Sequence, residues 1–167
     1  MAKNLPAFTI IAALPEDAPR LTQIAFDSKA FWGYPDHWLK LWRSYLEITA
    51  DSLRTDIVFK AIDEKGAILG FYRLSKIEGG MHLTAFWIAP PFIRMGLGRA
   101  LYAHMLEIAK NLGVSHIEWE CDPLSSPFYE KMGASYVGTK TYSMNGQEWT
   151  VPLMQVNLAS DDKSFNY

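Results

Sequence analysis

The sequence predicts a mixed α/β domain that contains one parallel β-α-β crossover. Apolar runs rich in β-branched and aromatic residues alternate with segments of helical periodicity. Residues 98–112 form the clearest helical segment, and Gly113 directly after it is a typical helix stop. Because this helix lies between two expected strands, we expect a right-handed parallel crossover. The apolar positions expected on one face of this helix are Leu97, Leu101, Met105, Ile108 and Leu112.

The first half of the chain predicts a strand, two helices and three more strands. A strand at 8–12 precedes a helix that starts within residues 15–19, where acidic residues and prolines favour a helix N-terminus. A second helix is expected to begin near Pro35. Its expected apolar stripe consists of Trp38, Leu41, Trp42, Tyr45 and Leu46. Three strands are then expected at 57–62, 67–74 and 81–88.

The second half predicts a strand at 114–121, a short helix and a closing hairpin. Ser125 or Ser126 can cap the short helix, which is expected to run through Met132. The final strands, 135–142 and 150–158, flank an Asn145-Gly146 turn. With no linker or repeat visible, we expect one domain over residues 1–159 and a flexible tail at 160–167.

Composition excludes several classes of protein. The 167 residues carry 16 Lys+Arg and 18 Asp+Glu, so the formal net charge of −2 argues against a general nucleic-acid binder. The single cysteine, Cys121, excludes a disulfide framework and a cysteine-rich zinc module. No long apolar run predicts a membrane span and no secretory signal is visible, so we expect a cytoplasmic protein.

A glycine-containing loop between the strand at 81–88 and the helix at 98–112 indicates phosphate binding. The N–H groups at a helix N-terminus bind anions, and Gly96 and Gly98 lack the Cβ atoms that would hinder a phosphate. Arg94 and Arg99 add positive charge. A Walker A loop is excluded because Gly-Lys-Ser/Thr is absent, and a Rossmann fingerprint is disfavoured because Leu101 occupies its third small position.

Two segments together resemble the GNAT superfamily of N-acetyltransferases. They are IRMGLGRAL at 93–101 and FYEKMGA at 128–134, and the resemblance extends over residues 8–158. A subgroup of that superfamily has a Ser-Lys-x-x-Trp-Gly-Tyr segment, found here at 28–34, and an Asp-Pro…Phe-Tyr-Glu segment, found here at 122–130. Two positions depart from the family pattern: Ile93 replaces the usual Gln or Arg, and Asp122 replaces an Asn found in many relatives.

The resemblance implies a mostly antiparallel twisted sheet with helices on both faces, and acetyl-CoA as co-substrate without a metal. It places the pyrophosphate on the N–H groups of the 94–99 loop and the pantetheine arm beside the strand that ends at Ile88. The cofactor-binding residues implied in this way are Phe86, Trp87, Ile88, Arg94, Met95, Gly96, Leu97, Gly98, Arg99, Asp122, Ser125 and Phe128.

Catalysis requires a neutral amine and a protonated leaving thiolate. By resemblance, Tyr129 is the general acid, since its unperturbed pKa of about 10 keeps it protonated at neutral pH. His82 is the candidate base, with Glu118 and Glu120 as alternatives, because an unperturbed imidazole pKa is about 6.5. A covalent route through Cys121 is the less favoured alternative, since no His partner is evident in sequence.

The expected acceptor is the primary amine of a small molecule or peptide. Aromatic side chains can stack on a ring or surround a cationic amine, although Trp38 fits the second helix's core stripe better. The candidate acceptor-binding residues are Phe31, Trp32, Tyr34, Glu118, Glu120 and Trp149. A non-catalytic acyl-CoA sensor and a protein N-acetyltransferase are alternative functions, and a homodimer is possible.

Overall fold

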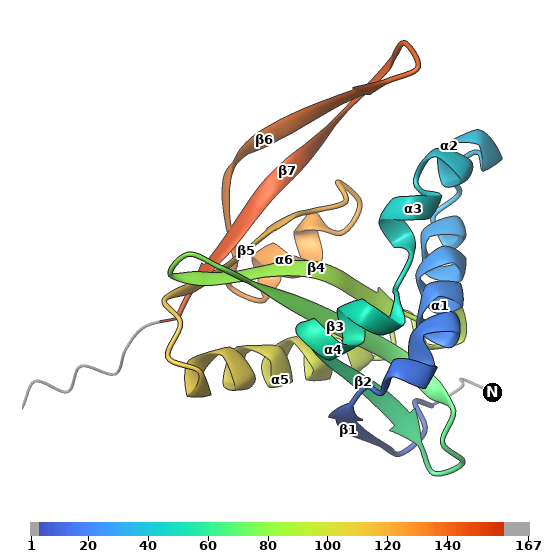
Figure 1. The fold of residues 1–167 in the computed structure, drawn as a ribbon, viewed down its shortest axis with the longest axis vertical. Coiled ribbons are helices and arrows are strands. Elements are labelled where there is room, and N and C mark those ends of the chain that lie inside the picture. Colours follow the sequence, from blue (N-terminus) through green and yellow to red (C-terminus); the bar gives the residue numbers. More distant parts are fainter. Residues whose placement is uncertain (1–3, 159–167) are drawn as a thin grey trace, which may run out of the picture. The chain divides into compact units, whose positions relative to one another are not determined.

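The computed structural model describes residues 4–158, and their seven strands hydrogen-bond in the order β1-β2-β3-β4-β5-β7-β6 (Figure 1). The β4–β5 pair is parallel, whereas the β1–β2, β2–β3, β5–β7 and β6–β7 pairs are antiparallel. This confirms the predicted mixed α/β class with one parallel crossover. The strands are β1 Phe8–Ala12, β2 Ile57–Asp63, β3 Ile68–Ile77, β4 Gly80–Ile88, β5 His116–Glu120, β6 Ser135–Met144 and β7 Gln147–Asn157.

Six α-helices and two 3-10 turns accompany these strands in the described part of the chain. The helices are α1 Ala18–Phe31, α2 Asp36–Leu41, α3 Arg43–Leu46, α4 Ala50–Thr55, α5 Leu97–Asn111 and α6 Ser126–Lys131, and the 3-10 turns are Pro15–Asp17 and Pro90–Phe92. None of the helices between residues 4 and 158 has the length and apolar character that crossing a membrane requires.

The chain divides into two compact units. The first contains the residues up to Ser75 together with Thr84–Ala103, and the second contains Lys76–Leu83 together with the residues from His104 on. The strands β3 and β4 and the helix α5 each contribute residues to both units. The expected tail at 160–167 lies outside the described residues.

The core of the first unit lies between α1 and the sheet. Leu21 and Ile24 on α1 are buried in one cluster with Val58 on β2 and Phe71 on β3. The start of α1 is held by Asp17, whose Oδ2 accepts the Leu14 N–H at 2.7 Å and the Lys60 ammonium at 2.6 Å. A lysine buried on a strand is tolerated because this ion pair compensates its charge.

The region between α1 and β2 differs from the prediction. The expected single second helix is wrong, because α2 ends at Leu41 and α3 begins at Arg43. Tyr45 is 63% exposed, so it does not belong to the buried stripe. The helix α4 was not expected, since its six residues are too few to show an apolar periodicity. Its N-terminus is a capping box in which Thr49 accepts the backbone N–H of Ser52.

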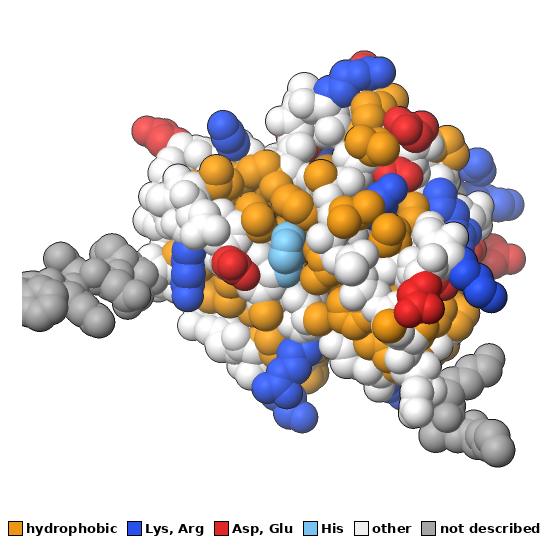
Figure 2. Space-filling model, turned by 90° about the horizontal axis from the view of Figure 1, so that it is seen from below, with side chains coloured by type: hydrophobic (Ala, Val, Ile, Leu, Met, Phe, Trp, Pro, Cys, Tyr) orange, Lys and Arg blue, Asp and Glu red, His pale blue; other side chains and the backbone are white. Residues whose placement is uncertain are grey.

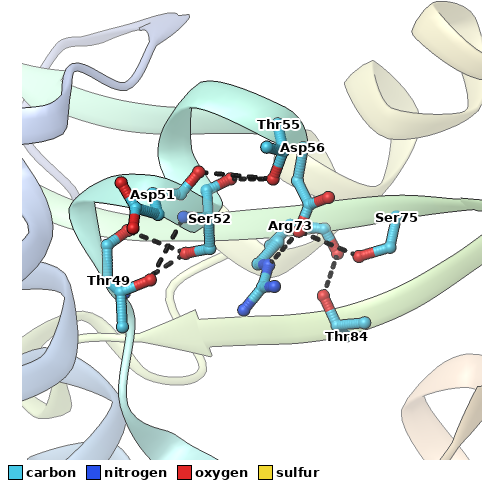
Figure 3. Close-up of polar contacts among 8 residues, drawn as sticks. All are labelled: Thr49, Asp51, Ser52, Thr55, Asp56, Arg73, Ser75 and Thr84. Atoms are coloured by element: carbon cyan, nitrogen blue, oxygen red, sulfur yellow. Dashed lines mark hydrogen bonds and ion pairs between the residues drawn. The ribbon is translucent and has the colours of Figure 1, made fainter.

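A polar cluster ties the end of α4 to β3 (Figure 3). The Arg73 Nε lies 2.6 Å from Asp56 Oδ2, and the Ser75 hydroxyl donates to the same oxygen at 3.0 Å. The Thr84 hydroxyl on β4 donates to the Arg73 carbonyl at 3.2 Å. The Asp56 and Arg73 side chains are only 14% and 23% exposed, so this pair is a structural contact that water screens weakly.

Two helix predictions are corrected in detail. On α5, Leu97, Leu101 and Met105 are fully buried as expected, whereas Leu112 lies beyond the helix end and is 50% exposed. Ser125 occupies the N-cap position of α6, but its side chain makes no capping hydrogen bond. A proline in the first turn favours this helix start without a side-chain cap.

The second unit ends in the β6–β7 hairpin, drawn in orange and red in Figure 1. The turn residues Asn145 and Gly146 have φ values of 52° and 75°, as a type I′ turn requires, so the predicted turn is confirmed.

On the face of the molecule drawn in Figure 2, hydrophobic side chains are interspersed with charged side chains of both signs.

Candidate active site

The loop before α5 presents open backbone in the first unit. Arg94 and Gly96 have positive φ values of 64° and 94°, and a Cβ added at Gly96 would meet no other atom within 4 Å. The first N–H groups of a helix have no acceptor within the helix, and at α5 these belong to Leu97, Gly98 and Arg99. The residues present therefore fit a phosphate group, which needs close approach to backbone N–H groups and positive charge.

The predicted residues of this loop differ in how far their side chains are exposed to a ligand. The Leu97 side chain is fully buried and anchors α5, so only its backbone can contact a cofactor. Met95 and Gly98 are partly exposed, whereas Arg94 and Arg99 are exposed. The two guanidinium groups are thus accessible to an anion from solvent.

The end of β4 packs closely within the first unit. The Phe86 ring lies 6.5 Å from the Tyr102 ring on α5. A Cβ added at Gly70 on β3 would lie 2.9 Å from the Trp87 carbonyl oxygen and 3.0 Å from Ile88 Cδ1, so only glycine fits there. The β5 strand pairs with β4 only at Met81 and His82. Residues 84–88 of β4 therefore lie beyond the part of this strand that pairs with β5.

The predicted acceptor residues on and after α1 divide into two groups. Trp32 meets the Phe31 ring edge-on at 5.5 Å, and the Arg94 guanidinium lies 5.7 Å from the Trp32 ring. Phe31 is 49% exposed. Tyr34 instead packs edge-on against Trp42 at 5.0 Å.

The Lys29 ammonium lies close to both rings of that second group. Its distance is 4.5 Å from the Tyr34 centroid and 4.5 Å from the Trp42 centroid. Trp38 packs on Trp42 at 5.3 Å. Tyr34 and Trp38 are therefore engaged in local packing, whereas Trp32 lies beside Arg94 of the loop before α5 and contacts Phe31.

The second unit has an open sheet face that carries several predicted site residues. His82 on β4 is the register partner of Glu118 on β5, and Glu120 lies two residues further along the same strand. Because partners in a sheet share a face and strand residues alternate, these three side chains point to the same side. The opposite face is closed, since Met81, Ile117 and Trp119 are buried.

On this open face, Glu120 accepts hydrogen bonds from two side chains of β6. Its Oε1 accepts the Lys140 ammonium at 2.9 Å, and its Oε2 accepts the Tyr142 hydroxyl. The Tyr142 ring stacks on Trp149 at 5.4 Å, and the Lys140 ammonium lies 4.8 Å from the Tyr142 ring. Glu118 is more accessible, with 50% of its side chain exposed and His116 Nε2 at 3.6 Å.

These contacts shift the protonation equilibria of the cluster. Partial burial acts in the opposite direction, but hydrogen bonds from Tyr142 and Lys140 and the charges of Lys140 and His82 hold the pKa of Glu120 below its ordinary value. The hydrogen bond to Glu120 raises the pKa of Lys140. Burial, followed by the hydrogen bond to Glu120, raises the pKa of Tyr142. At neutral pH, the cluster therefore holds an ionised carboxylate beside an ammonium group.

Tyr129 lies against the closed side of β5. It is only 6% exposed, and its ring lies 4.9 Å from the Trp119 ring and 5.0 Å from the Phe128 ring. Preceding it, Asp122 Oδ1 accepts the Leu124 N–H at 2.9 Å and so shapes the loop before α6. Cys121 is buried, and its thiol donates to the Asp122 carbonyl at 3.2 Å.

Sequence reasoning missed Lys140 and Tyr142. Both lie on β6 and alternate on one face, but lysine and tyrosine on an exposed hairpin strand give no distinctive signal. Only the register Lys140–Val151 and Tyr142–Trp149 places them on the side of Glu120. Among residues 4–158, the structure shows no group of three or more His, Cys, Asp or Glu side chains arranged to hold a metal ion.

Comparison with known proteins gives the class to which this fold and loop belong. The chain is similar to the thialysine N-epsilon-acetyltransferase of Caenorhabditis elegans, with 29% identity over 122 residues that cover 67% of this chain and 71% of that protein. A GCN5-related N-acetyltransferase from Rhodopseudomonas palustris superposes with a TM-score of 0.75 and 21% identity over 95% of this chain and 99% of that chain.

A third similar protein was solved with a cofactor. The PaiA N-acetyltransferase from Thermoplasma acidophilum, in complex with coenzyme A, has a TM-score of 0.70 and 16% identity, covering 90% of this chain and 99% of that chain. The fold and these similarities define an acyltransferase. The profile of the acetyltransferase (GNAT) family matches residues 18–134, and the chain belongs to that family.

Proposed function

We propose that this enzyme transfers an acetyl group from acetyl-CoA directly to the primary amine of a small molecule or peptide, within a ternary complex. The single observation that carries the proposal is the loop before α5, where Gly96 leaves open backbone beside Arg94 at the start of a 15-residue helix. Family membership supports acetyl transfer as the chemistry.

Binding of acetyl-CoA is assigned to two segments of the first unit. The N–H groups of Gly98 and Arg99 and the guanidinium groups of Arg94 and Arg99 would hold the pyrophosphate. The end of β4 at 86–88, which lies beyond the residues that pair with β5, would hold the pantetheine arm by strand-like hydrogen bonds. When bound, acetyl-CoA supplies an acetyl group activated as a thioester. A backbone N–H of β4 would stabilise the negative charge that develops on the thioester oxygen.

Proton removal from the amine is assigned to His82. It lies on the open face opposite Glu118, and an imidazole accepts a proton near neutral pH. Glu120 is the weaker candidate base, because Lys140 and Tyr142 stabilise its ionised form. We assign to Glu118 and Glu120 the attraction of the ammonium form of the acceptor before the proton is removed.

Proton delivery to the departing thiolate is assigned to Tyr129. Its hydroxyl is an O–H donor at neutral pH, and contacts with Trp119 and Phe128 fix the position of its ring. Cys121 is not assigned a covalent role, because its thiol is buried and donates to a backbone carbonyl. A Cys121→Ala variant is expected to keep the wild-type initial rate.

The experiment that tests this function is a thiol-release screen with acetyl-CoA and a panel of amines, amino acids, polyamines and lysine peptides. Release that depends on an acceptor, with the acetylated product seen by mass spectrometry, is the expected result. Tight binding of coenzyme A without release for any acceptor would favour a sensor. Reaction with lysine peptides alone would favour a protein N-acetyltransferase.

A further inference from the structure

The β6–β7 hairpin places a fixed positive charge on the open face of the second unit. The Lys140 ammonium is held by Glu120 Oε1 at 2.9 Å and by the Tyr142 ring at 4.8 Å. The Tyr142 ring in turn stacks on Trp149, with the two rings 20° from parallel. Lys140 is nevertheless accessible, because 51% of its side chain is exposed.

The charged side chains on this face follow one another across the strands β4, β5 and β6. His82 and Glu118 are register partners on β4 and β5, and Glu120 follows on β5. Two strands further on, Lys140 is the register partner of Val151 on the same face. The face therefore presents negative charge beside the candidate base and positive charge toward the sheet edge. A molecule that carries an ammonium and a carboxylate matches this order.

Building on the proposed function, we propose that Lys140 binds a carboxylate of the acceptor, so that the substrates are amino acids or other amines that bear a carboxylate. The amine of such a substrate lies toward Glu118 and His82, and its carboxylate lies against the Lys140 ammonium. Polyamines, which carry a second positive charge at this position, are disfavoured.

The geometry favours this role over a purely structural ion pair. An ammonium has three N–H donors, so contact with Glu120 leaves Lys140 able to bind a further anion. Glu120 and the Tyr142 ring limit the conformations of the lysine side chain, which lowers the entropy lost when a carboxylate binds. The pair is open to solvent mainly on its lysine side, since 51% of the Lys140 side chain but only 17% of the Glu120 side chain is exposed.

The test compares acceptor pairs that differ only by a carboxylate: lysine and cadaverine, ornithine and putrescine, tyrosine and tyramine. The wild-type enzyme is expected to have the higher kcat/KM for the amino acid in at least one pair. Lys140→Met is expected to lower that preference about tenfold or more, mainly through KM, because it removes a charge-assisted contact. Lys140→Arg keeps the charge and is expected to retain most of the preference.

Lys110→Met is the matched control, since Lys110 is an exposed lysine in the last turn of α5. This variant is expected to keep the wild-type preference, and thermal melts check that each of the three variants is folded at the assay temperature. A higher kcat/KM for the decarboxylated amines, or the same preference in Lys140→Met, would overturn the inference while the proposed function stands. Reaction with none of the six acceptors would also overturn it, and only the wider screen decides whether acetyl transfer itself fails.

Discussion

At the scale of single residues, Glu120 shows how a carboxylate is kept charged within a half-buried face. Two donors from β6, Lys140 and Tyr142, each bind one of its oxygens. Because these contacts stabilise the ionised form, Glu120 acts as a fixed negative charge, which favours the proposed assignment of proton removal to His82. The proposed catalytic roles thus follow from the environment of each group more than from its residue type.

The lowered pKa of Glu120 has a consequence for acid stability. A carboxyl group whose folded-state pKa is lowered stabilises the fold above its unfolded-state pKa, and this contribution is lost as the pH falls through the folded-state pKa. Glu120→Gln is therefore expected to make the melting temperature less dependent on pH between about pH 5 and pH 2. His82, Glu118, Lys140 and Tyr142 face Glu120, and of these Lys140 and Tyr142 do not titrate in that range.

Thermal melts across that pH range provide the measurement. Glu64, exposed in the turn between β2 and β3, is the control, and Glu64→Gln is expected to leave the acid slope as in the wild type. Parallel acid slopes for the wild type and Glu120→Gln would contradict the account.

Tyr129→Phe tests the proposed general acid. Removing the hydroxyl while keeping the ring preserves the contacts with Trp119 and Phe128. The expected result is a kcat lowered by about 100-fold, with the Kd for coenzyme A unchanged by calorimetry. Tyr136→Phe, at a tyrosine that is 56% exposed on β6, is the control and should keep full activity. Equal kcat values for wild type and Tyr129→Phe would remove Tyr129 from the mechanism.

At the scale of elements, the loop before α5 depends on a backbone conformation that favours glycine. Gly96 and Gly66 both have positive φ, at 94° and 81°, and a Cβ at either position would meet no atom within 4 Å. Alanine at either position should therefore cost about 1 kcal/mol of stability. Only Gly96→Ala is expected to weaken coenzyme A binding, by about tenfold or more, because its Cβ would occupy the approach of the phosphate.

Calorimetric titration of both alanine variants with coenzyme A separates backbone strain from cofactor contact. Gly66→Ala, in the turn between β2 and β3, is expected to bind as the wild type does. If both variants lost affinity equally, or neither did, Gly96 would have no particular role in phosphate binding.

The connection between α4 and β3 gives a prediction about stability. Asp56→Asn leaves the Arg73 guanidinium, 23% exposed, without its counter-charge, so the free energy of unfolding should fall by about 2 kcal/mol. Asp51→Asn on α4 is the matched control, because the side chains of the Arg54–Asp51 pair are 59% and 93% exposed. That substitution should change stability by no more than about 0.5 kcal/mol. Urea denaturation measures both values, and equal losses would contradict the assignment.

At the scale of the whole molecule, strong local sequence signals were sufficient to predict the fold class. The amphipathic α5, the Asn145-Gly146 turn and the parallel crossover followed from periodicity and turn chemistry. The break between α2 and α3 and the helix α4 did not, because segments of four to six residues are too short for periodicity to show.

Residues of the candidate site could be predicted from the sequence only where they belong to a recognisable motif. The segment containing Gly96 has a local signature, and so has the segment containing Tyr129. Lys140 and Tyr142 approach Glu120 across about 20 residues of sequence, through strand register alone. A one-residue change in that register would turn both side chains to the other face, and no pattern in β6 fixes it, since nearly all of its residues are exposed.

Two-substrate initial-rate kinetics test whether the acetyl group passes directly from acetyl-CoA to the amine within a ternary complex. With acetyl-CoA varied at several fixed acceptor concentrations, direct transfer is expected to give double-reciprocal lines that intersect. Release of coenzyme A should depend strictly on the acceptor. Parallel lines, or release of coenzyme A with formation of an acetyl-enzyme in the absence of acceptor, would contradict it.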